Sequence, residues 1–176
     1  MEAVPRQCAF VGLGGNLGDV QAQLKAALAG LQALPGTSVA AVSSLYRTRP
    51  VDAQGPDYLN AVVALQSALG PAELLRALHR LETTQDRQRP YLNAPRTLDL
   101  DLLWYGDVHR QTPFLTLPHP RMFLRAFVLV PLHEVLGSQP AASPALASAM
   151  PAADILAALA REQGIEKLPP SADWPN

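Results

Sequence analysis

Apolar and polar residues alternate with clear periods over the first part of the chain. Four short runs bounded by glycine, proline or polar residues predict strands. Leucines at steps of three and four predict two amphipathic helices. The first follows Asp19, which can cap it, and the second opens at Pro71 with Glu73 in its first turn. The strands are expected over Cys8–Leu13, Val39–Tyr46, Tyr58–Gln66 and Thr97–Tyr105.

The resulting order is strand, helix, strand, strand, helix, strand, and it predicts an α+β fold with a ferredoxin-like βαββαβ core. The sheet is expected to be mainly antiparallel, with both helices packed on one of its faces. A Rossmann sheet would need strands and helices in regular alternation, which this order lacks. We therefore expect a single domain over residues 1–176, in which an extension follows the core.

The C-terminal part of the chain carries weaker patterns. The apolar run Phe127–Leu132 predicts a strand that Pro131 interrupts. The Ala-, Ser- and Pro-rich stretch 137–151 predicts a surface loop, and the apolar positions 155, 156 and 159 predict a short last helix. Residues 167–176 are expected to form a loose tail.

Composition narrows the range of functions. The chain has 176 residues with 14 Lys and Arg against 15 Asp and Glu, which gives a formal net charge of −1. Such a balance argues against binding nucleic acid or an anionic membrane with the whole surface. Cys8 is the one cysteine, so an internal disulfide is excluded. No apolar run is long enough to span a bilayer and no signal peptide is recognisable, so a cytoplasmic location is expected. The sequence does not determine the oligomeric state, and a monomer is the working expectation.

Two aspartates in the last predicted strand are the strongest chemical signal. Side chains alternate between the faces of a strand, so Asp99 and Asp101 share one face. Their Cα atoms are then about 6.6 Å apart, close enough for both carboxylates to converge on Mg²⁺. The alternative is an exposed strand face with solvated aspartates, although Asp is rare in strands. The opposite face is expected to be core and contains Leu98, Leu100, Leu102 and Trp104.

Arginines gather in sequence on either side of this strand. Their guanidinium groups keep their charge and match phosphate oxygens bidentately, so the grouping predicts a metal-bound polyphosphate. Ordinary surface arginine is the alternative for each one alone. If the backbone is helical after His119, the two arginines that follow it share one helix face. The arginines are Arg87, Arg89 and Arg96 before the strand, and Arg121 and Arg125 after it.

Two further features are compatible with ligand binding. Tyr58 and Asn60 share one strand face, and a ring beside an amide suits a flat heterocycle, although a polar sheet surface explains them equally well. The glycine-rich turn 12–19 is neither a dinucleotide fingerprint nor a Walker A loop. His119, held between two prolines, could donate to a phosphate or a base, or could simply shape a turn.

Taken together, these motifs resemble the 6-hydroxymethyl-7,8-dihydropterin pyrophosphokinases of folate biosynthesis. The hallmark is the run Ala94-Pro95-Arg96-Thr97-Leu98-Asp99-Leu100-Asp101-Leu102-Leu103, and the resemblance extends from about Phe10 to Val135. Supporting matches are Gly14-Gly15-Asn16-Leu17-Gly18-Asp19, the run 43–48, the run 56–61, and Leu117-Pro118-His119-Pro120-Arg121 with the run 125–129. One departure is Gly15, which stands where the family commonly has Ser.

The resemblance implies transfer of pyrophosphate from ATP to the hydroxymethyl group of the pterin, with release of AMP. It implies two Mg²⁺ ions held by Asp99 and Asp101, and catalytic roles for Arg87 and Arg96. These two arginines would also contact ATP, together with Glu82, His119, Arg121 and Arg125. The implied pterin pocket consists of Thr48, Val51, Tyr58, Asn60 and Phe127.

Two rival functions stay open from the sequence. Another Mg²⁺-dependent nucleotide enzyme, such as an ordinary kinase or a nucleotidyltransferase, would use the same carboxylates and arginines. A non-catalytic module that senses ATP and pterin would use the same fold without turnover. Products distinguish them, because pyrophosphoryl transfer yields AMP, a kinase yields ADP and a nucleotidyltransferase yields pyrophosphate.

Overall fold

The computed structural model describes residues 5–50, 55–84, 97–139 and 143–175. Its main sheet has six strands in the order β5-β1-β4-β3-β8, and β2 also pairs with β4. All of these pairings are antiparallel. The strands are β1 (Gln7–Gly15), β2 (Thr37–Val42), β3 (Tyr46–Thr48), β4 (Tyr58–Ser67), β5 (Asp99–Tyr105) and β8 (Glu166–Lys167), while β6 (Arg110–Gln111) and β7 (Thr116–Leu117) form a separate hairpin.

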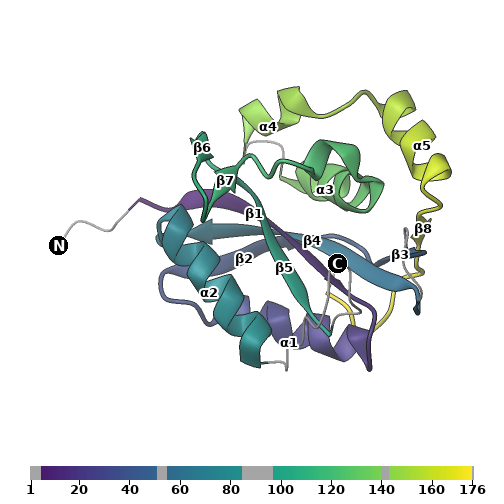
Figure 1. The fold of residues 1–176 in the computed structure, drawn as a ribbon, viewed down its shortest axis with the longest axis horizontal. Coiled ribbons are helices and arrows are strands. Elements are labelled where there is room, and N and C mark those ends of the chain that lie inside the picture. Colours follow the sequence, from purple (N-terminus) through teal and green to yellow (C-terminus); the bar gives the residue numbers. More distant parts are fainter. Residues whose placement is uncertain (1–4, 51–54, 85–96, 140–142, 176) are drawn as a thin grey trace.

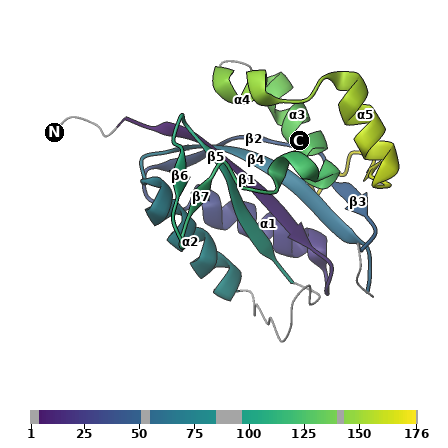
Figure 2. The ribbon, with the colours of Figure 1, turned by 45° about the horizontal axis from the view of Figure 1, so that its top comes forward.

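Helices cover both faces of the sheet. The predicted helices α1 (Val20–Gln32) and α2 (Pro71–Thr84) lie on one face, and Asp19 caps α1 by accepting a hydrogen bond from the Ala22 amide. On the opposite face lie η1 (Met122–Leu124), α3 (Ala126–Ser138), α4 (Pro144–Ala149) and α5 (Ala153–Glu162) (Figures 1 and 2). The strand order and the two helices of the first face confirm the predicted ferredoxin-like core, and the second helical layer is an addition to it.

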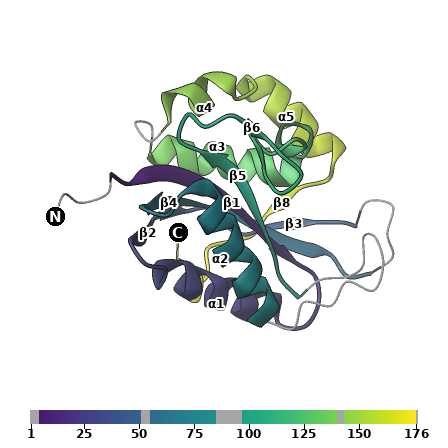
Figure 3. The ribbon, with the colours of Figure 1, turned by 60° about the vertical axis from the view of Figure 1, so that its left-hand side comes forward.

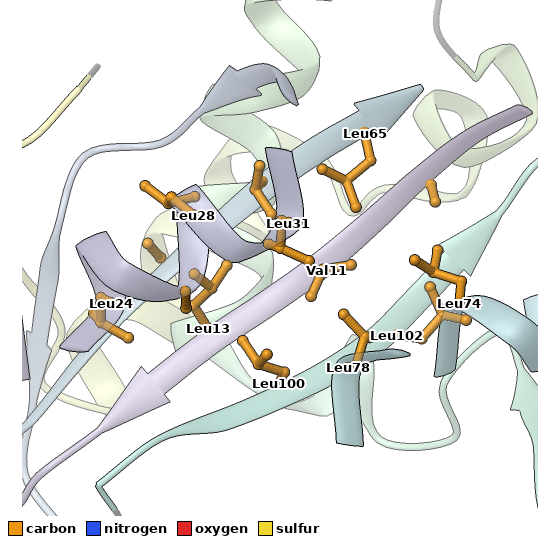
Figure 4. Close-up of a cluster of buried hydrophobic side chains, with 14 of the residues drawn as sticks. Val11, Leu13, Leu24, Leu28, Leu31, Leu65, Leu74, Leu78, Leu100 and Leu102 are labelled. Carbon is orange, nitrogen blue, oxygen red and sulfur yellow. The ribbon is translucent and has the colours of Figure 1, made fainter. Parts of the chain in front are cut away.

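The first helical face holds the larger apolar cluster. Leucines of α1 and α2 meet the alternate side chains of β1, β4 and β5 (Figure 4). Burying a large aliphatic side chain contributes roughly 1.5–3 kcal/mol, so this cluster is the main source of stability. Fully or almost fully buried members include Val11, Leu24, Leu65, Leu78 and Leu100.

A β-bulge corrects the prediction for the last strand of the core. Phe10 is aligned with Trp104 but Val11 with Leu102, so Leu103 is the extra residue of β5. An extra residue reverses the alternation of side chains beyond it. Trp104 therefore packs with Leu103 in the second cluster, beneath α3. Leu98, Leu100 and Leu102 belong to the first cluster, on the other face of the sheet. Asp99 and Asp101 lie before the bulge and keep the predicted face.

The C-terminal part differs most from the sequence-based expectation. Residues 126–138 are the helix α3, not a strand, and Pro131 lies inside it. A short apolar run cannot distinguish a buried strand from a buried helix by periodicity alone. The predicted loop 137–151 contains α4, which Ser143 caps and Leu146 anchors with a fully buried side chain. The predicted last helix is confirmed as α5.

The predicted loose tail is ordered against the sheet. After α5 the chain adds β8 to the edge of β3 and then crosses to the α1 side (Figure 3). Trp174 is buried there and its Nε1–H donates to the Ser43 carbonyl at 2.8 Å. The predicted single strand 39–46 is likewise divided, because Ser43 leaves the ladder between β2 and β3 and its hydroxyl accepts from the Val62 amide. No helix in the described part of the chain is long and apolar enough to cross a membrane.

Candidate active site

Two glycines leave a strip of β1 without side chains between two polar strands. Gly14 is aligned with Asp99 of β5 on one side and with Asn60 of β4 on the other, and Gly12 is aligned with Asp101. Aligned residues of neighbouring strands point to the same face. A Cβ at Gly14 would lie 3.0 Å from Asn60 Oδ1, so a larger residue would fill this strip. At Gly14 the sheet face between Asp99 and Asn60 therefore carries no side chain from β1, whereas at Gly12 the Leu103 side chain lies 3.5 Å from where a Cβ would be.

The two aspartates lie side by side at the edge of the sheet, each half-buried. Arg125 Nη1 is 3.9 Å from Asp101 Oδ2, and the two side chains are 28% and 37% exposed. An ion pair of this length and exposure contributes little to stability. Its consequence is local, because it places a cation beside the carboxylates that the sequence predicts as metal ligands.

His119 is fixed beside the aspartates by the bulge of β5. Its backbone N–H donates to the Leu103 carbonyl at 2.9 Å. Its Nδ1 accepts from the Arg121 amide at 3.2 Å, so the neutral ring has its hydrogen on Nε2. Burial lowers the pKa of His119, the charges of Arg125 and Arg121 lower it further, and those of Asp101 and Asp99 oppose them. The ring is therefore a neutral hydrogen-bond donor near pH 7.

The segment after His119 is not a continuous α-helix. Arg121 precedes the 3-10 turn η1, and Arg125 follows that turn with an extended backbone. The two arginines therefore do not share one face of an α-helix, which the spacing of four had suggested. Arg121 is exposed and Arg125 is half-buried, with its guanidinium carbon 5.4 Å from the centre of the Phe127 ring.

Three of the predicted pterin-pocket residues meet on the same sheet face. Thr48 of β3 is aligned with Tyr58 of β4, and Asn60 Nδ2 donates to Thr48 Oγ1 at 3.0 Å. Thr48 and Asn60 are buried, and Tyr58 is partly exposed. Phe127 belongs to the first turn of α3, the helix that packs against β3 and β4. The polar pair is thus held rigidly within the sheet.

Glu82 occupies a different environment from the other predicted ATP contacts. Its side chain is 1% exposed, and its Oε1 accepts from the Leu100 amide at 2.9 Å. Leu100 lies between the two aspartates on the edge strand β5. Glu82 therefore fixes the strand that presents the carboxylates, and its contact with ATP stays a prediction.

Three predicted site residues, Arg87, Arg96 and Val51, lie outside the described residues, and their roles stay predictions. Sequence reasoning also missed Glu134 of α3. Its carboxylate accepts from Tyr46 Oη at 2.7 Å, from Ser44 Oγ at 2.8 Å and from the Ser44 amide at 3.2 Å. An acidic residue within an otherwise apolar helix was the available signal.

A cavity of about 490 Å³ lies beside β3, at the C-terminal end of α5. Of the predicted site residues described by the structure, it includes Thr48 alone. Its other walls carry both charges, from Arg47, Arg49 and Asp57 on one side and from residues of the segment 162–166 on the other. The cavity therefore adjoins the Thr48–Asn60 pair through Thr48, while Asp99 and Asp101 do not line it.

The carboxylate pair fits a metal that completes its coordination with substrate. Within the described ranges, no group of three or more His, Cys, Asp or Glu gathers that could hold a metal ion. Mg²⁺ is commonly bound through one or two carboxylates and takes its remaining ligands from water and phosphate. Gly12 and Gly14, which are aligned with Asp101 and Asp99, add no side chain of their own beside the two carboxylates.

Comparison with known proteins supports one family. The model of the 7,8-dihydro-6-hydroxymethylpterin-pyrophosphokinase (HPPK) family matches residues 10–137. A 2-amino-4-hydroxy-6-hydroxymethyldihydropteridine pyrophosphokinase of Synechocystis is 47% identical over 133 residues, which are 74% of this chain and 68% of the relative. The enzyme of the same name from Haemophilus influenzae is 43% identical over 128 residues, or 72% of this chain and 80% of the relative.

Solved structures agree in fold. An HPPK-DHPS crystal structure of Plasmodium falciparum superposes with a TM-score of 0.58 at 12% identity, over 76% of this chain and 41% of that one. A second HPPK-DHPS crystal structure gives a TM-score of 0.59 at 13% identity, over 75% of this chain and 40% of that one. This chain thus spans well under half the length of those proteins, and the likeness supports the fold alone.

The fold and the site together define a class, a ferredoxin-like α+β protein with a carboxylate pair, a histidine and an arginine at one end of its sheet. Within that class the assignment is specific. The chain belongs to the 7,8-dihydro-6-hydroxymethylpterin-pyrophosphokinase family.

Proposed function

We propose that this protein transfers pyrophosphate from ATP to the hydroxymethyl group of 6-hydroxymethyl-7,8-dihydropterin, giving the pterin diphosphate and AMP in folate biosynthesis. The observation that carries the proposal is the alignment of Asp99, Gly14 and Asn60 in one row of the sheet. It supports a phosphate-and-metal side on β5 and a heterocycle side on β4, separated by a strip without side chains. Membership of the family gives independent support.

Asp99 and Asp101 would hold the two Mg²⁺ ions. When bound, the metal neutralises charge on the phosphate oxygens and orients the attacking and leaving oxygens. The two carboxylates lie on one strand face and are fixed there by the backbone pairing of β5 with β1. A rigid strand is a precise platform for such ligands, since phosphoryl transfer depends mainly on positioning and electrostatic stabilisation.

The cationic and neutral donors around the carboxylates have separate roles in the proposal. Arg125 lies within 3.9 Å of Asp101 and carries a permanent charge toward the triphosphate. His119, neutral near pH 7, donates through Nε2 without adding charge. Arg87 and Arg96 would meet the triphosphate and the transferring group, and Arg121 would contact ATP from the exposed rim.

On the other side of the strip, Asn60 and Thr48 provide buried polar groups for the pterin. The hydrogen bond between them fixes the Asn60 amide, which has one further N–H and its oxygen available to pair with a heterocycle. Tyr58 and Phe127 supply the aromatic surfaces of the proposed pocket, and Val51 would complete it. The pterin hydroxymethyl oxygen would attack the β-phosphorus of ATP, with AMP as the leaving group.

The deciding experiment incubates the protein with Mg²⁺, ATP and 6-hydroxymethyl-7,8-dihydropterin and resolves the nucleotides by chromatography. We expect pterin-dependent AMP from the wild type and at least about 10²-fold less from Asp99→Ala, the loss seen when one charge-stabilising group is removed. ADP would indicate an ordinary kinase and pyrophosphate a nucleotidyltransferase. Bound ATP without any product would indicate a sensing module.

The proposal also includes the oligomeric state, the location and the partners of the protein. A monomer in the cytoplasm is proposed, with small-molecule substrates and without nucleic acid as a partner. The net charge of −1 supports the last point. Sedimentation of the purified chain, with and without ATP, tests the monomer.

A further inference from the structure

Arg125 joins two helical segments, and the amide of the residue that follows it has no partner within α3. It lies between η1 and α3 with φ −116° and ψ 110°, and it is the N-cap residue of α3 without a side-chain capping bond of its own. The first amide of a helix has no partner within the helix and needs one from elsewhere. The guanidinium of Arg125 nevertheless occupies a defined position, next to Asp101 and over the Phe127 ring.

The partner of the Ala126 amide is a residue of the C-terminal extension. Gln163 Oε1 accepts from the Ala126 amide at 2.8 Å, and Gln163 Nε2 donates to the Leu124 carbonyl at 3.0 Å. One side-chain amide thus binds the backbone on both sides of Arg125. A pair of hydrogen bonds from a single planar group fixes position and orientation together.

Gln163 is itself held by the chain around it. It caps the C-terminus of α5, where its backbone N–H bonds to the Leu159 carbonyl. Beyond it, β8 lies beside β3 (Figure 3). The Leu168 amide donates to the Leu45 carbonyl at 2.9 Å, and Trp174 is buried. These contacts do not involve the Gln163 side chain. Replacing that side chain should therefore leave the extension docked.

We propose that Gln163 is a positioning residue for nucleotide binding, which acts by clamping the backbone on either side of Arg125. It lies beyond residues 10–137, the part that the family model matches, so the role belongs to the extension of this chain. The inference rests on the proposed function, in which Arg125 contacts ATP. The extension then contributes to the active site through the α3 N-terminus, although it provides no group that touches the nucleotide.

The test compares Gln163→Leu with Gln32→Leu. Gln32 is a matched control, because its Oε1 also accepts a backbone hydrogen bond, from the Val39 amide at 2.8 Å, at the opposite end of β4 from the site. Two readouts are taken on the same samples. One is the Kd for a non-hydrolysable ATP analogue with Mg²⁺, by calorimetry, and the other is AMP formation with KM determined for each substrate.

We expect Gln163→Leu to raise the nucleotide Kd and the KM for ATP about three- to tenfold, the size of effect that corresponds to the net loss of a single hydrogen bond. The KM for the pterin should stay unchanged, and Gln32→Leu should change none of these values. In an Arg125→Ala background, Gln163→Leu should have no further effect on nucleotide binding, because both changes remove the same interaction.

Equal nucleotide Kd values for Gln163→Leu and Gln32→Leu overturn the role of Gln163, even where pterin-dependent AMP formation upholds the proposed function. An additive effect in the Arg125→Ala background also overturns it, because Gln163 would then act by another route. Conversely, a wild type that binds the analogue but forms no AMP overturns the proposed reaction, and the Kd comparison still decides the role of Gln163. A wild type that binds no nucleotide overturns both.

Discussion

The two faces of the sheet use the same strands for opposite purposes. On the α1–α2 face, β1 presents Val11 and Leu13 to a closed layer of leucines. On the α3 face, the intervening positions Gly12 and Gly14 present no side chain, and Gly14 lies between the polar residues Asp99 of β5 and Asn60 of β4. Alternation with a period of two allows one strand to build a core and a site at once. Stability and chemistry are therefore separable by substitution.

Removing a carboxylate from the site face should have the largest effect and should be confined to activity. We expect Asp101→Ala to lower AMP formation by about 10²- to 10³-fold, because the metal that would neutralise the phosphate charge loses one of its ligands. The unfolding midpoint in urea should change little, since the ion pair with Arg125 is long and partly exposed.

The control for this variant is Asp107→Ala. Asp107 is exposed and follows the C-terminal end of β5, so replacing it should change neither activity nor stability. An Asp101→Ala enzyme that unfolds several kcal/mol more easily would show that the carboxylate supports the fold, and the separation of the two faces would fail.

Truncation on the closed face should have the reverse signature. Leu24 of α1 is fully buried among the first cluster (Figure 4), and Leu24→Ala should lower the free energy of unfolding by about 2–5 kcal/mol through lost burial and a cavity. KM values measured below the unfolding transition should equal those of the wild type.

Denaturant titration with parallel kinetics checks this expectation. Leu124→Ala is the matched stability control, because Leu124 is 71% exposed and should cost less than about 0.5 kcal/mol. If Leu24→Ala alters the KM for either substrate under conditions where the variant is fully folded, packing on this face is coupled to the site across the sheet.

Gly14 and Gly15 of β1 sharpen the comparison of the two sheet faces, because side chains at these consecutive positions would point to opposite faces. A Cβ at Gly15 would lie 2.5 Å from the Thr97 carbonyl oxygen and 3.2 Å from Val20 Cγ1, whereas one at Gly14 would meet the Asn60 side chain. Gly15→Ala should therefore lower the free energy of unfolding by about 1–3 kcal/mol, the usual cost of overpacking. Gly14→Ala should unfold almost as the wild type does and instead raise the KM for the pterin severalfold.

Measuring the urea midpoint and the KM for the pterin on both variants decides the point. Interchanged phenotypes would reverse the assignment of the two faces. The Thr97 carbonyl leaves no room for a Cβ at Gly15 in this chain.

The core and the common strand face of the two aspartates could be predicted because local patterns determine them. Leucine spacing specified α1 and α2, and the alternation of Asp99 and Asp101 with leucines specified which side chains share a face. Both features depend only on residues a few positions apart. Resemblance to the family added roles for residues such as His119 and Arg125, whose position depends on a 3-10 turn that periodicity does not reveal.

Features that depend on distant contacts could not be predicted. The bulge at Leu103 arises from the register between β1 and β5 and moves Trp104 to the other face. The run 127–132 is apolar on all sides, so its period does not exclude a strand, and only packing against the sheet makes it helical. Trp174 is ordered by the Ser43 carbonyl, 131 positions away.

The smallest effect is expected at Glu134, a carboxylate on the α3 face that accepts hydrogen bonds from other residues of the protein. Burial raises the pKa of Glu134, but hydrogen bonds from Tyr46, Ser44 and Lys167 outweigh it, and the pKa is lowered from its ordinary value of 4.5. Burial and the same carboxylate raise the pKa of the Tyr46 hydroxyl, which keeps it a donor. A folded-state pKa below the unfolded one means that ionised Glu134 stabilises the fold above pH 4.5 and loses this effect as the pH falls through the folded pKa.

Glu134→Gln should therefore lower the free energy of unfolding by about 1–2 kcal/mol at pH 7, the worth of hydrogen bonds to a charged group, and by much less below the folded pKa. Urea midpoints at both pH values measure this, with Glu166→Gln as the control. Glu166 pairs with Arg47 at 2.8 Å, but its side chain is 60% exposed, so solvent screens the pair and its loss should cost little at either pH. If Glu134→Gln lowers the free energy of unfolding by the same amount at both pH values, the shape of the side chain, and not its charge, holds α3 to β3. The carboxylates of this face would then differ from one another in packing alone. In the proposed function, by contrast, Asp99 and Asp101 bind substrate and metal, while Glu134 is hydrogen-bonded to Tyr46 and Ser44 of the protein itself.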